Sequence, residues 1–241
     1  MFYSFIAIII AVVSSLILFN VVRKNDFPEK RGFFLNYAFG FLLTSLLYLP
    51  VFIINLGIEI KYNLLLILYF FIFFSNFFSY FFFYRGSVLF FTKNKFFNTV
   101  FPIVWSSYAV VATTSLLIGG ITYGSVYTIS TWGFLLPINT YLSSMFFYYF
   151  KKGSLLDGAK TMRERLYMLV FGFGWFSILA LDGIRWGLLF SYPEKLWIIK
   201  LASLGSYLIV RSFAYLIILA GCFFYMKNLK KIKKLKQNKI F

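Results

Sequence analysis

Seven apolar stretches dominate the chain, and each is long enough to cross a membrane as a helix. A membrane-spanning helix needs about 20 mainly apolar residues, because each residue rises only about 1.5 Å along the axis. The stretches lie at residues 2–22, 33–56, 63–84, 98–119, 132–150, 167–190 and 197–226. Polar residues do not alternate with apolar ones, and each stretch exceeds the roughly 9–11 residues of a membrane β-strand. We therefore predict an all-α polytopic membrane protein.

The composition agrees with this class and excludes most others. Hydrophobic residues make up 61% of the chain and charged residues 13%, against about 45–50% and about 25% in soluble domains. The predicted organisation is a seven-helix transmembrane domain at residues 1–226 and a basic tail at residues 227–241. The first stretch resembles a signal peptide only in its apolarity, because no basic residue precedes it and Arg23 and Lys24 follow it. We expect it to be retained as a span.

Residue types that carry most enzyme and metal chemistry are scarce. The sequence has no histidine, and Cys222 is its single cysteine. Histidine-ligated metals, histidine-based proton relays and intrachain disulfides are therefore excluded. Of the seven acidic residues, only Asp182 falls inside a predicted span, so a pair of intramembrane carboxylates cannot form. We expect no metal, no cofactor, no catalytic residues and no enzymatic activity.

The basic residues fall in alternate loops and predict an orientation. One side carries the basic residues of the first, third and fifth connections and the seven lysines of the tail, whereas the other side has little beyond Lys61 and Lys195. Cytoplasmic loops carry the excess of Lys and Arg. We therefore expect the N-terminus outside and the C-terminus in the cytoplasm. The net charge of +17 follows from this surface, and no nucleic-acid partner is expected. The expected location is the cell membrane, with an organellar inner membrane as the alternative.

The tail at residues 227–241 has a pattern of its own. Its apolar residues Leu229, Ile232 and Leu235 recur every three positions among the lysines. This spacing favours a short amphipathic extension of the last helix, docked on anionic lipids of the bilayer. The alternative is a plain topology anchor. A separate cytoplasmic or membrane protein is a further candidate partner.

Charged residues inside the spans mark the candidate site. A charge at the bilayer centre costs about 2.5–3.5 kcal/mol on insertion scales, so it usually faces the bundle interior. On the last span, Lys200, Tyr207 and Arg211 share one helix face with Ser203 and Tyr215. On the sixth, Asp182 and Arg185 are three residues apart and adjacent on the helix surface. We expect a network of Asp182, Arg185 and Arg211 that either staples two helices or binds an anion.

Other spans add polar groups to the predicted interior. Asn76 lies on the third span and Asn139 on the fifth, among Ser, Thr and Tyr residues. Such groups commonly form hydrogen bonds between helices worth about 0.6 kcal/mol on average. Gly183 and Gly187 lie four apart, a spacing that permits close helix packing. The predicted ligand-binding set is Asp182, Arg185, Arg211, Tyr207, Lys200, Asn76 and Asn139.

Three functions fit this pattern. The first is a receptor-like or sensor-like protein that binds a small or lipidic ligand, favoured as anionic by the arginines, in a polar pocket between helices. The second is a transporter or channel for a small solute or ion, and the third is an accessory subunit of a larger membrane complex. Seven spans with an outside N-terminus resemble retinal proteins in architecture. A retinal Schiff base needs a mid-span lysine, however, and the mid-span cation here is Arg211.

Overall fold

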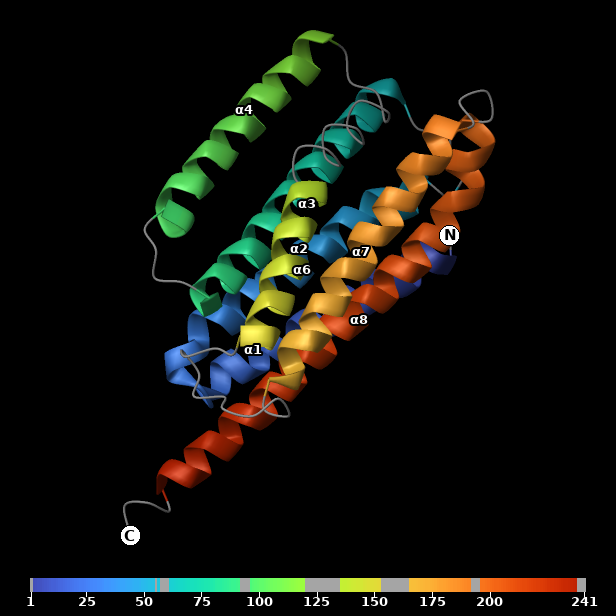
Figure 1. Ribbon diagram of the computed structural model, residues 1–241. Coiled ribbons are helices and arrows are strands. Elements are labelled where there is room, and N and C mark those ends of the chain that lie inside the picture. Colours follow the sequence, from blue (N-terminus) through green and yellow to red (C-terminus); the bar gives the residue numbers. More distant parts are fainter. Residues whose placement is uncertain are drawn as a thin grey trace.

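The computed structural model describes residues 2–54, 56, 61–91, 96–119, 135–152, 165–191 and 196–237. For some of these residues, among them 185–191 and 196–207, it describes the backbone alone. The regular structure of these residues is helical throughout (Figure 1). It consists of seven α-helices, a short 3-10 helix at Pro28–Lys30 and a π-helical turn at Phe96–Val100. The α-helices are α1 (Phe2–Lys24), α2 (Arg31–Ile54), α3 (Tyr62–Phe91), α4 (Phe101–Gly119), α6 (Leu136–Lys152), α7 (Leu166–Ser191) and α8 (Leu196–Gln237).

Each described α-helix covers one of the apolar stretches, which confirms the all-helical fold. Four helices carry segments that are long and apolar enough to cross a membrane: Phe2–Lys24, Arg31–Pro50, Leu166–Ile184 and Leu208–Lys231. The chain is therefore a helical membrane protein. The last helix extends past residue 226, the end of the predicted span, as expected for a helical extension into the tail. α8 continues through the lysine-rich segment to Gln237 and projects beyond the other helices (Figure 1).

Six of the described helices form a closed ring. α1 packs on α2, α2 on α3, α3 on α6, α6 on α7 and α7 on α8, and α8 packs back against α1. α4 lies outside this ring, beside α3 (Figure 1). Its buried side chains among the described residues are Trp105 and Ala112, and the Trp105 ring contacts Phe77 of α3 at 5.4 Å between centroids.

The interior of the ring is largely aromatic. Phe83 of α3 lies at its centre, with ring centroids 5.3 Å from Tyr37 of α2 and 5.1 Å from Trp175 of α7. A third contact, at 6.1 Å, reaches Tyr215 of α8. Gly40 on α2 makes room for this ring, because a Cβ atom there would lie 2.7 Å from a Phe83 carbon. Aromatic pairs at such distances contribute about 0.5–1.5 kcal/mol beyond their buried area.

Small residues form the buried face of α1. Ser4, Ala7, Ala11 and Ser14 are buried at helical spacing together with Leu18, whereas Phe5, Ile9 and Leu16 are exposed. In a membrane, helices associate through small residues that allow close approach, because lipid solvates large apolar side chains as well as protein does. The expectation of close packing fails at Gly183, which is exposed and where an added Cβ atom would have no described atom within 4 Å.

Candidate functional site: a buried arginine

Arg211 lies on α8 in the interior of the bundle and is only 4% exposed. Its Nε donates a hydrogen bond to the hydroxyl of Tyr215, one turn further along α8, at 3.2 Å. Its Nη2 donates to the hydroxyl of Tyr80 at 3.0 Å and to Oδ1 of Asn76 at 3.5 Å, both on α3. Three neutral side chains from two helices therefore hold the guanidinium group in place.

Two aromatic rings also contact this cation. The centre of the guanidinium lies 5.7 Å from the centroid of the Tyr80 ring and 5.8 Å from that of Tyr215. At these distances a cation is attracted by the ring quadrupole, by about 2 kcal/mol when the pair is desolvated. Each tyrosine thus contributes both its ring face and its hydroxyl. These contacts offset part of the cost of removing the charge from water.

Asp182 supplies the negative charge of this region. It lies on α7 and is fully buried. Tyr48 and Tyr80 are buried in the same interior. Tyr48 belongs to α2, so the polar region joins side chains from four helices. The two charges are opposite in sign, which lowers the electrostatic penalty of burying each of them.

Two further polar groups of this region have unused hydrogen-bonding capacity. Asn139 of α6 is fully buried, and neither its amide nitrogen nor its amide oxygen forms a hydrogen bond in the described structure. The Tyr48 hydroxyl is likewise buried without a hydrogen bond among the described residues. Buried polar atoms without partners are rare in proteins, and each such group needs an explanation.

The structure brings together part of the predicted set. Asn76 and Arg211 are in direct contact, and Asn139 and Asp182 lie in the same interior. The side chains of Arg185, Lys200 and Tyr207 lie outside the described residues. The predicted set omitted Tyr48, Tyr80 and Tyr215. The sequence does hold a signal for two of them: Tyr80 follows Asn76 by four residues and Tyr215 follows Arg211 by four, which places each pair on one helix face.

Comparisons with known proteins add no assignment. No protein-family model matches the chain, and neither the curated proteins nor the solved structures include a match. The class of the protein, a helical membrane protein with a buried arginine site, therefore follows from its own residues.

Proposed function

We propose that the protein is a receptor-like or sensor-like membrane protein that binds a small anionic ligand around Arg211. The observation that supports this most is the pairing of a fixed, buried guanidinium with the unsatisfied polar atoms of Asn139 and Tyr48. Guanidinium groups bind carboxylates and phosphates through parallel N–H donors. An amide and a hydroxyl beside them supply the further donors and acceptors that orient such a ligand.

The depth of the site favours a sensor over an open pore. Asn76, Asn139, Asp182 and Arg211 are each at most 5% exposed. A ligand that entered between the described helices would have to separate them. Binding would therefore stabilise one arrangement of the ring over another, and a ligand shifts such an equilibrium by its difference in affinity for the two states. The output would pass to a separate cytoplasmic or membrane partner.

The same proposal includes seven membrane crossings in the cell membrane. The six-helix ring and α4 together give seven described α-helices. The basic residues fall in every second connection along the sequence. An odd number of crossings would place the two ends on opposite sides of the membrane, and the excess of Lys and Arg would put the lysine-rich end of α8 in the cytoplasm and the N-terminus outside. The tail would then face the anionic lipids of the inner leaflet.

The test is to identify small molecules that copurify with the protein. Wild-type protein extracted with its native lipids would be compared by mass spectrometry with Arg211→Gln and with Arg85→Gln, which removes an exposed arginine of α3. We expect an anion in wild-type and Arg85→Gln samples, and a roughly 10- to 100-fold loss of its affinity in Arg211→Gln, since hydrogen bonds to charged groups contribute about 1.5–3 kcal/mol.

A second variant separates binding from stability. Arg211→Gln leaves Asp182 buried without its counter-charge, which destabilises a protein. The double variant Asp182→Asn/Arg211→Gln removes both charges and keeps the region neutral. If this double variant retains the anion, Arg211 only joins α3 to α8 and the proposal is wrong. Accumulation of the labelled anion inside proteoliposomes would instead indicate the transporter function.

A further inference from the structure

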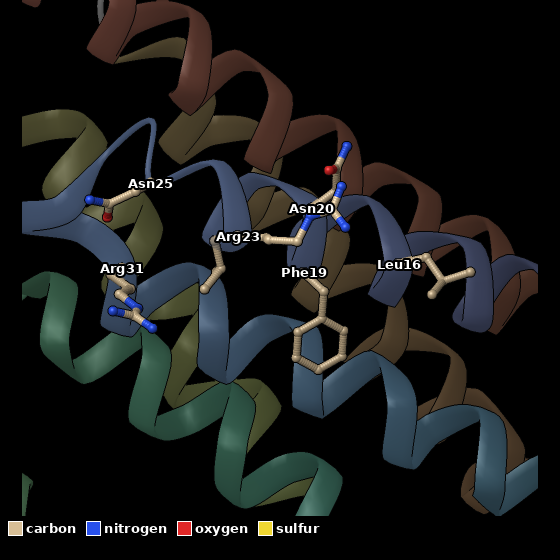
Figure 2. A pocket seen from close by; sticks show the side chains of 7 residues that line it. Leu16, Phe19, Asn20, Arg23, Asn25 and Arg31 are labelled. Atoms are coloured by element: carbon tan, nitrogen blue, oxygen red, sulfur yellow. The ribbon is translucent and has the colours of Figure 1, made fainter.

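A groove of about 800 Å³ lies where α1 ends and α2 begins, far along the chain from the Arg211 site (Figure 2). Its lining combines two arginines, two asparagines and three apolar side chains: Leu16, Phe19, Asn20, Val22, Arg23, Asn25 and Arg31. Six of them belong to α1 or the turn after it, and Arg31 is the first residue of α2. Arg31 and Asn25 lie at the turn, whereas Arg23 extends along α1 beside Asn20 and the apolar side chains (Figure 2).

The turn sets the positions of the two arginines. Asn25 adopts a left-handed conformation with φ of 51°, and its N–H donates to the carbonyl of Val22 at 3.1 Å. This ends α1 in the manner of a helix C-cap. The buried side chain of Phe27 then anchors the turn on the bundle. Arg23 and Arg31 are thereby fixed on the two sides of one short connection (Figure 2).

Arg23 and Arg31 are both exposed. Neither Arg23 nor Arg31 forms an ion pair within the part of the chain that the structure describes. Residues 23–31 contain four basic and two acidic side chains, so the connection as a whole is positive. An anion is the complement of these arginines.

The apolar side chains of the groove lie along α1. Leu16 is 61% exposed on the outward face of α1, a helix that is long and apolar enough to cross a membrane. From Leu16 to Asn25 a helix rises about 13 Å. The polar headgroup region on one side of a bilayer is roughly 5–8 Å thick. With α1 across a bilayer and its C-terminal end at the headgroups, the groove would extend from the headgroup region into the hydrocarbon.

We propose that this groove binds an anionic phospholipid of the leaflet that surrounds it. The negative charge of the headgroup is attracted by Arg23 and Arg31, and the first part of an acyl chain lies along Leu16 and Phe19. A soluble anion would match the arginines but would leave the apolar side chains uncovered. The proposal rests on the placement of α1 and α2 in the membrane and does not require a ligand at Arg211.

The experiment measures lipid binding to the full-length protein in detergent by native mass spectrometry. Dioleoylphosphatidylglycerol and dioleoylphosphatidylcholine serve as probes, because they share acyl chains and differ in net charge. We expect the phosphatidylglycerol to bind more tightly than the phosphatidylcholine. Its affinity should fall about 30-fold in Arg23→Gln/Arg31→Gln, since each cation near anionic lipid contributes roughly a factor of five. All substituted side chains are exposed, so the fold should be retained.

A charge-matched control and a soluble competitor decide the outcome. Arg85→Gln/Lys152→Gln also removes two exposed cations but leaves the groove intact, and we expect it to lose at most a few-fold in affinity. An equal loss in both double variants would mean that surface charge alone attracts the lipid and would overturn the proposal. Full displacement of the lipid by millimolar glycerol phosphate would also overturn it, because a soluble phosphate would then be the occupant.

Discussion

At the scale of single residues, the chain places a permanent charge in an apolar helix and surrounds it with tyrosines. Tyr80 and Tyr215 each offer a hydroxyl and a ring face to Arg211, and Asn76 adds an amide oxygen. These partners are neutral, so they stabilise the cation without cancelling its charge. The opposite charge in the same interior is that of Asp182 on α7.

Asn139 gives a test of whether this interior is built for stability or for binding. Neither atom of its buried amide is hydrogen-bonded among the described residues, and leaving a polar group in that state costs about 1–3 kcal/mol. Asn139→Leu keeps a similar volume and removes both polar atoms. We expect this variant to be more stable by about 1–3 kcal/mol, measured by thermal melting in detergent, and to bind the copurifying anion more weakly.

The matched control is Asn36→Leu on α2. The Asn36 amide donates to the carbonyl of Gly32 at 2.6 Å, so its removal should leave stability unchanged or reduced. If Asn139→Leu also lowers the melting temperature, the Asn139 amide contributes to stability, and the interpretation that its polar atoms serve to bind a ligand is wrong.

At the scale of elements, α7 and α8 pack closely because glycines remove side chains at their contact. A Cβ atom on Gly174 would lie 2.6 Å from Cγ1 of Ile218, and 3.2 Å and 3.3 Å from two backbone atoms of α8. On α8, a Cβ atom on Gly221 would lie 3.0 Å from the Phe171 ring. Backbone atoms cannot move aside as a flexible side chain can. This contact positions Asp182 and Arg211 on adjacent helices.

Gly174→Ala should therefore separate α7 from α8. We expect a loss of about 1–3 kcal/mol in stability, the usual effect of overpacking, detected as a lower melting temperature on size-exclusion chromatography of heated samples. Gly183→Ala is the control on the same helix, since Gly183 is exposed. It should be neutral or slightly stabilising, because alanine favours helix over glycine. Equal losses in both variants would show that the two helices do not depend on Gly174 for their close contact.

At the scale of the whole molecule, the ring of six helices and the outlying α4 predict a defined placement of the two chain ends. With an odd number of crossings, the ends lie on opposite sides of the membrane. Cys222 is fully buried, so the wild-type protein offers a silent background for labelling with an impermeant maleimide. Tyr3 and Lys231 lie near the two ends of the chain, and both are exposed.

We expect Tyr3→Cys to be labelled on intact cells, and Lys231→Cys only after permeabilisation, because the lysine-rich end should stay in the cytoplasm. The unsubstituted protein is the control and should remain unlabelled in both conditions. Labelling of both variants from the same side would show an even number of crossings. The reverse pattern would show an inverted orientation.

The sequence by itself determined the class of fold and the position of its helices. Apolar length decides whether a segment becomes a helix in a membrane, since every backbone group there must be hydrogen-bonded within its own segment. The described helices accordingly follow the seven apolar stretches. The helical period also indicated that Arg211 and Tyr215 share a face, as do Asn76 and Tyr80.

Only the tertiary structure decided which faces meet. The ring order that joins α8 to both α7 and α1, the position of α4 outside the ring and the contact between α3 and α8 at Arg211 are choices among neighbours. Helical periodicity fixes the direction in which a side chain points but not the helix that it contacts. That partner depends on the fit of small and large side chains between helices, as at Gly174 and Ile218, and this fit exists only once all of them are packed together.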